Sequence, residues 1–188
     1  MKLGSLFDGA GTCPYAASLC GIKPVWASEI EPFPIAVSSS NFPSMIHLGD
    51  ITGVHGDQIE PVDIITFGSP CQDLSQAGKR AGLDGSRSGL FMEAIRIFKE
   101  MRSATNGRYP QIVIWENVPG AFSSNKGEDF RTVLQELCGI KDPSLSVPGP
   151  PSRGGESDGP IAERSWQTSF HCVESPGRQR LGSSPETP

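Results

Sequence analysis

The stretch Asp63-Ile-Ile-Thr-Phe-Gly-Ser-Pro-Cys-Gln72 decides the fold. Its first five residues form a largely β-branched and aromatic run, which is typical of a strand buried on both faces. Gly68 and Pro70 then end the strand, and Cys71 follows at once. A thiol just past a buried strand is either placed for chemistry or is an inert, half-buried side chain, and this stretch alone leaves both interpretations open.

Working outward in both directions, apolar runs alternate with segments of helical periodicity. This alternation predicts an α/β fold, in which helices cover both faces of a Rossmann-like parallel sheet. We also expect the runs Ile64-Ile65 and Ile112-Val113-Ile114 to be buried on both sides. The expected strands are residues 2–7, 25–28, 45–48, 63–67 and 111–115, and the expected helices are 12–21, 32–39, 89–101 and a segment around 130–137.

Glycines and carboxylates follow the ends of these strands, where open parallel sheets bind their ligands. The turn Phe7-Asp-Gly-Ala-Gly11 follows the first strand, Glu29 the second, Asp50 the third and Glu116-Asn117 the fifth. The first three of these together predict a site for a nucleoside-containing cofactor, with Glu29 accepting hydrogen bonds from ribose hydroxyls. The alternatives are a tight turn without a ligand, carboxylates exposed at strand ends, and a loop carboxylate at Glu116 that caps a helix.

Composition bounds the class of protein. The net charge of -5 does not indicate a nucleic-acid partner, and the 36% of hydrophobic residues fall mostly before about Ile140. The sequence contains no apolar stretch of membrane-spanning length, so we expect a soluble, cytoplasmic protein. The five cysteines form no C-x-x-C pair and the three histidines do not cluster, which argues against a disulfide framework or a metal site.

Three motifs, in their order and spacing, resemble those of bacterial and phage DNA cytosine-5 methyltransferases of restriction-modification systems: Phe7-Asp-Gly-Ala-Gly11, Pro70-Cys-Gln72 and Glu116-Asn-Val118. The resemblance covers roughly residues 1–138. It implies the fold of methyltransferases that use S-adenosylmethionine, that compound as methyl donor, and double-stranded DNA as partner. Transfer-RNA cytosine methyltransferases carry the same motifs, so the nucleic acid stays open. Further matches are Gly68-Ser69, Gly89-Leu-Phe91, Glu29 and Gly49-Asp-Ile51.

The resemblance also implies roles for individual residues. Cys71 is the expected nucleophile that attacks C6 of an extruded cytosine, and Glu116 the expected acid at its N3. Residues 73–88 are expected to form a long mobile loop that closes over DNA. The residues expected at the cofactor are Phe7, Asp8, Gly9, Gly11, Glu29, Ile30, Asp50, Ile51 and Pro70. Those expected at the nucleic acid are Gln72, Ser75, Lys79, Arg80, Arg87 and Asn117.

The last part of the sequence differs in kind from the rest. We expect a partial catalytic domain over residues 1–145 and a disordered tail over 146–188, because the tail is rich in Pro, Gly and Ser. The tail is either natural or the product of a frameshift near Gly154-Gly155. Codons for 181–188, read one nucleotide later, can give Trp-Gly-Val-Pro-Gln-Arg-Arg, which resembles the arginine motif of the family. The family's recognition domain and returning segment are not legible, so an inactive chain that at most binds S-adenosylmethionine is the alternative function.

Overall fold

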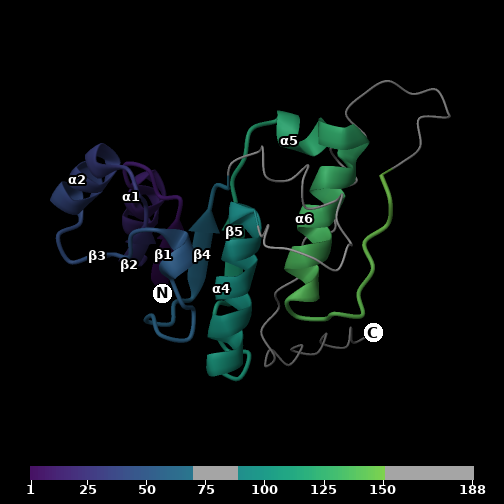
Figure 1. The fold of residues 1–188 in the computed structure, drawn as a ribbon. Helices are drawn as coiled ribbons and strands as arrows, with labels where there is room; N and C mark the ends of the chain where they lie inside the picture. Colours follow the sequence, from purple (N-terminus) through teal and green to yellow (C-terminus); the bar gives the residue numbers. More distant parts are fainter. Residues whose placement is uncertain (70–88, 151–188) are drawn as a thin grey trace, which may run out of the picture.

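The computed structural model describes residues 1–69 and 89–150 (Figure 1). Within these residues one parallel sheet has the strand order β3-β2-β1-β4-β5. The order reverses between β1 and β4, which is the switch point where such sheets open a crevice for ligands. The predicted α/β class with a parallel sheet is confirmed. The strands are β1 (Lys2–Leu6), β2 (Lys23–Ser28), β3 (Ile46–His47), β4 (Ile64–Phe67) and β5 (Ile112–Trp115).

The helices lie close to the predicted segments. α2 begins at Pro32, where a fixed backbone φ angle suits the first turn of a helix. α6 carries Glu128 and Asp129 in its first turn, where carboxylates interact favourably with the helix dipole. No helix within the described residues is long and apolar enough to cross a membrane. The helices are α1 (Thr12–Leu19), α2 (Pro32–Asn41), α4 (Leu90–Ala104), α5 (Gly120–Ser123) and α6 (Glu128–Gly139), with short 3-10 helices η1 (Ile51–Gly53) and η3 (Ser124–Gly127).

The main hydrophobic core lies between the sheet and α4. Phe67 of β4 contacts Phe91 and Phe98 of α4, with ring centroids 6.0 and 5.2 Å apart. α6 adds to the same core through Phe130, which stacks on Trp115 of β5 at 5.9 Å. A smaller cluster on the other face consists of Leu3, Ala17 and Ile64, partly covered by Ile22. Helices therefore cover both faces of the central strands, as predicted.

β5 departs from the sequence prediction. β4 is buried along its whole length, but Ile112 and Ile114 are 39% and 48% exposed. Ile112 is paired with Ile64, whose side chain packs in the α1 cluster, so both exposed isoleucines lie on the α1 face. Because α1 packs on β1 and β2, and β5 ends the strand order, no described residue covers this face of β5. The prediction that residues 112–114 are buried on both sides was wrong.

Candidate active site at the carboxyl ends of the strands

The turn after β1 has the backbone that a close-fitting loop requires. Gly9 and Gly11 have positive φ angles of 59° and 88°, and Phe7 adopts φ 57°, which costs energy for a residue with a side chain. A Cβ atom at Gly11 would lie 3.0 Å from the Cβ of Ser38 in α2. No atom lies within 4 Å of the position that a Cβ at Gly9 would take, so a ligand can approach the backbone there.

Glu29, directly after β2, ties its strand to this turn. One carboxylate oxygen accepts a hydrogen bond from the Gly9 amide at 2.8 Å, and the other accepts from the amides of Ile30 and Glu31 at 2.8 and 3.0 Å. Partial burial acts to raise the pKa of Glu29, but these three amides outweigh it and hold the pKa below its usual value. Glu29 is therefore an anion, and it has lone pairs left to accept further donors.

Asp50, in the segment after β3, presents a second carboxylate at the same edge. Its Oδ1 accepts hydrogen bonds from the amide and hydroxyl of Thr52 at 2.9 and 2.8 Å, which caps η1. The Thr52 amide is the main reason that the pKa of Asp50 is lowered. Asp50 is exposed, and its Oδ2 has no hydrogen-bond partner among residues 1–69 and 89–150. The Ser28 hydroxyl, which donates to the Gly49 carbonyl at 2.7 Å, joins this segment to the end of β2.

Asp8 has a different environment. It is only 8% exposed, and neither carboxylate oxygen has a hydrogen-bond partner within the described structure. Burial raises the pKa of Asp8 more than the neighbouring Ser5 and His47 lower it.

The other predicted cofactor residues differ in burial. The side chain of Ile51 is buried, whereas Ile30 is 64% exposed and Phe7 is half-buried against the core. Asp8 and Ile51 could therefore meet a ligand through their backbone rather than their side chains.

The ends of β4 and β5 lie side by side and are joined by polar contacts. The side-chain amide of Asn117 donates to the backbone carbonyl of Ser69 at 2.9 Å, and the Trp115 ring nitrogen lies 3.5 Å from the Ser69 hydroxyl. A Cβ atom at Gly68 would lie 3.2 Å from Oε2 of Glu116, so glycine gives this carboxylate room against the end of β4. Glu116 is exposed, and the cap position of α5 is occupied by Pro119 instead. The alternative role of Glu116 as a helix cap is therefore not supported.

Comparison with known proteins identifies the family. The sequence profile described as C-5 cytosine-specific DNA methylase matches residues 1–140. The chain belongs to this family. The predicted resemblance is thus confirmed over nearly the same residues.

Two relatives illustrate the family match, and one solved structure illustrates the fold. A DNA N-6-adenine-methyltransferase of Escherichia phage P1 is 34% identical over 161 residues, which are 82% of this chain and 21% of that protein. Type II methyltransferase M1.ScrFI of Lactococcus lactis subsp. cremoris is 40% identical over 116 residues, 62% of this chain and 28% of that protein. The Dnmt2 methyltransferase of S. pombe has the same fold, with a TM-score of 0.53, 22% identity, and coverage of 73% of this chain and 42% of that one.

The chain therefore spans about a fifth to three tenths of the length of these two curated relatives. The name of the phage P1 relative specifies adenine N6, whereas the matching family profile is specific for cytosine C5. Because the match covers only 21% of the phage protein, the activity in that name is not assigned to the matched segment.

The family's predicted site residues fall into two groups. The structure brings the turn after β1, Glu29 and Asp50 together at one edge, and it places Glu116 and Asn117 next to Ser69 at the same carboxyl edge of the sheet. The other predicted residues lie outside the described residues, and their roles stay predictions. These are Pro70, Cys71, Gln72, Ser75, Lys79, Arg80 and Arg87, together with the predicted loop 73–88 and most of the predicted tail.

The sequence pattern alone did not single out Arg96 and Glu100 of α4, which contact the segment after Asp50, or Glu93, which pairs with Arg96. Their spacing of three and four residues, which places them on one helix face, was the available signal. His55, Asp57 and Glu100 also offer ligand-type atoms within 4.8 Å of one another. Both Glu100 oxygens accept hydrogen bonds from Arg96, whose positive charge disfavours a cation there. We therefore assign Glu100 to an ion pair.

Proposed function

We propose that this chain carries the cofactor site and the nucleophile of a DNA cytosine-5 methyltransferase. In this proposal it transfers a methyl group from S-adenosylmethionine to C5 of cytosine in DNA through a covalent adduct with Cys71. Family membership supports the reaction class. The observation that carries the residue assignment is the contact between the ends of β4 and β5. Glu116 borders Gly68, and Asn117 holds Ser69, which stands two positions before Cys71 in the sequence.

The residues at the other half of the edge fit S-adenosylmethionine. Glu29, an anion at the end of β2, offers acceptors for ribose hydroxyls, and Oδ2 of Asp50 offers an acceptor for the adenine amino group. The open backbone at Gly9 allows close approach of the methionine part. When bound, the cofactor supplies an electrophilic methyl group on a sulfonium.

The proposed chemistry begins with extrusion of the cytosine from the DNA stack, which costs a few kcal/mol. The Cys71 thiolate then adds to C6 and forms a carbon–sulfur bond. Glu116 donates a hydrogen bond or proton to N3, so that the displaced electron pair is held at C5. After C5 has acquired its methyl group, a base such as solvent water takes its proton. The electrons of that C–H bond restore the ring double bond as the thiolate leaves C6, and a proton held at N3 returns to Glu116.

A trapping experiment tests this proposal. The full chain is incubated with S-adenosylmethionine and a DNA duplex in which 5-fluorocytosine replaces cytosine. Fluorine at C5 cannot leave as a cation, so the last step is blocked and the adduct persists. We expect a covalent protein–DNA species in the intact mass spectrum. Cys71→Ser should abolish it, whereas Cys20→Ser, which removes an exposed thiol elsewhere in the sequence, should not.

Glu116→Gln is the companion variant. Loss of a positioned general acid lowers rates by about 100-fold or more, so adduct formation should slow by that factor. The main alternative is cofactor binding without methyl transfer, because the chain spans 21–28% of the two curated relatives described above. Calorimetric binding of S-adenosylmethionine without any trapped species would favour that alternative and contradict the proposal.

A further inference from the structure

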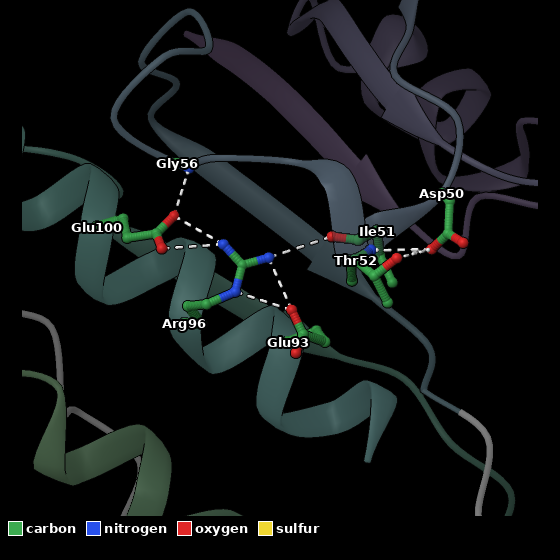
Figure 2. Close-up of polar contacts among 7 residues, drawn as sticks. All are labelled: Asp50, Ile51, Thr52, Gly56, Glu93, Arg96 and Glu100. Carbon is green, nitrogen blue, oxygen red and sulfur yellow. Dashed lines mark hydrogen bonds and ion pairs between the residues drawn. The ribbon is translucent and has the colours of Figure 1, made fainter. Parts of the chain in front are cut away.

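Helix α4 carries an ion network centred on Arg96 (Figure 2). Its Nε and Nη2 atoms contact Oε2 of Glu93 at 2.8 and 2.7 Å. Its Nη1 donates to both oxygens of Glu100 at 2.9 Å. The side chains of Glu93, Arg96 and Glu100 are 14%, 30% and 29% exposed, so water weakens these pairs less than it weakens a surface ion pair.

The network reaches across to the segment that follows β3. Nη2 of Arg96 donates to the carbonyl oxygen of Ile51 at 3.3 Å, and Oε2 of Glu100 accepts from the Gly56 amide at 2.7 Å. Partial burial acts to raise the pKa of Glu100, but the Gly56 amide and Arg96 outweigh it and lower the pKa. The segment from Ile51 to Gly56 is thus attached to α4 near both of its ends (Figure 2).

Packing adds a steric constraint to these hydrogen bonds. A Cβ atom at Gly56 would lie 2.2 Å from the carbonyl oxygen of Ile97, so the backbone of this residue rests directly on α4. Ile51 and Val54 are buried in the main core. The segment therefore has little freedom to move relative to the helix.

Asp50 immediately precedes this segment and depends on it for its orientation. Its Oδ1 is held by Thr52, the residue after Ile51, which leaves Oδ2 for an outside donor. A shift of Ile51 and Thr52 would move Asp50 with them. We propose that Arg96 is a positioning residue for the adenine subsite: it fixes the Ile51–Gly56 segment so that Asp50 faces the amino group of the adenine. This inference rests on the proposed function, in which Asp50 accepts from the cofactor's adenine.

The test compares two ligands in the full chain. S-adenosylhomocysteine has an amino group on its base, whereas its inosine counterpart has a carbonyl at that position, which accepts hydrogen bonds and cannot donate to Asp50. Their dissociation constants are measured by calorimetry for the wild type, Arg96→Met and Lys99→Met. Lys99 lies on the same helix but contacts Glu136 of α6 at 3.4 Å, so it is the matched control.

We expect Arg96→Met to raise the dissociation constant of the adenosyl ligand by about tenfold, which is the equivalent of one charge-assisted hydrogen bond. The dissociation constant of the inosyl ligand should change little. The preference for adenine should therefore shrink, and Lys99→Met should keep it. Equal weakening of both ligands, or an unchanged preference, would show that Arg96 acts only on stability and would overturn the proposal.

A second measurement is independent of cofactor binding. Hydrogen exchange at the Gly56 amide should be faster in Arg96→Met than in the wild type or Lys99→Met, because Glu100 loses the partner that orients it. Unchanged exchange would overturn the positioning role even if the ligands bind. Failure of the wild type to bind either ligand would instead reject the proposed cofactor site, while the exchange data would still decide whether Arg96 holds the segment.

Discussion

Glu29 and Asp8 illustrate how two carboxylates at one sheet edge acquire opposite properties. Glu29 accepts hydrogen bonds from three backbone amides, whereas Asp8 is buried without a hydrogen-bond partner in the described structure. The pKa of Glu29 is consequently lowered and that of Asp8 is raised. Only the first arrangement stabilises the charged side chain, so the two residues should affect folding with opposite dependence on pH.

Glu29→Gln should lower the free energy of unfolding at neutral pH by about 1–2 kcal/mol, because an amide replaces a carboxylate acceptor. A lowered folded pKa gives a contribution that is present above the unfolded value of 4.5 and disappears as the pH falls through the folded pKa. Urea unfolding across this range measures the difference. Glu31→Gln, at the adjacent exposed residue, is the control, and an equal loss in both variants would refute the assignment.

Asp8→Asn should have the reverse pH profile. A raised folded pKa makes the wild type lose stability as the pH rises from the ordinary value of 3.8 through the folded pKa. The variant has no charge to bury, so above this range it should be more stable than the wild type by about 1 kcal/mol. Thermal unfolding of Asp8→Asn and of the exposed control Asp57→Asn checks this. A difference that does not vary with pH would count against the account.

At the scale of elements, α4 holds residues 51–56 of the segment between β3 and β4, while β2 holds residues nearer the two ends of this segment. Arg96 and Glu100 supply the polar contacts, and Gly56 supplies the close backbone approach. The sheet alone would not fix it, since β3 pairs with β2 through only Ile46 and His47. The position of residues 51–56, and of Asp50 before them, therefore depends on packing against α4 as well as on the sheet.

Gly56→Ala tests this packing directly. The added methyl would lie 2.2 Å from the carbonyl oxygen of Ile97, and overpacking of this kind costs about 1–3 kcal/mol of stability. Gly53→Ala is the matched control in the same segment, because a Cβ there has no atom within 4 Å. Urea unfolding should show a lower free energy of unfolding for Gly56→Ala alone. Equal midpoints for the two variants would mean that the segment can move away from α4 at no cost in stability.

For the molecule as a whole, the sequence predicted the locations of the strands and helices better than it predicted which faces of the sheet are covered. Hydrophobic periodicity located the strands and helices because each buries an apolar face along its own length. It could not show that Ile112 and Ile114 are exposed, since that depends on what covers an end strand. It also missed Arg96, because a charged residue on a helix resembles a solvated one until its long-range partners are known.

Truncation can test the predicted domain boundary at residue 145 against the contacts that continue to Val147. Val147 is 7% exposed, its carbonyl accepts from Arg131 at 3.0 Å, and its amide donates to Gln135 at 2.8 Å. A chain ending after residue 150 should therefore unfold like the full chain. One ending after residue 145 should be less stable by about 2–3 kcal/mol, from one buried valine and two hydrogen bonds. Equal stability of the two shortened chains would place the boundary at residue 145.

The identity of the methylated base tests the central claim most directly. The full chain is incubated with S-adenosylmethionine carrying a labelled methyl group and with double-stranded DNA, which is then digested to nucleosides and separated by mass spectrometry. The account predicts label in 5-methyldeoxycytidine, and none with the Cys71→Ser variant. Label in N6-methyldeoxyadenosine, or equal labelling by wild type and Cys71→Ser, would contradict it.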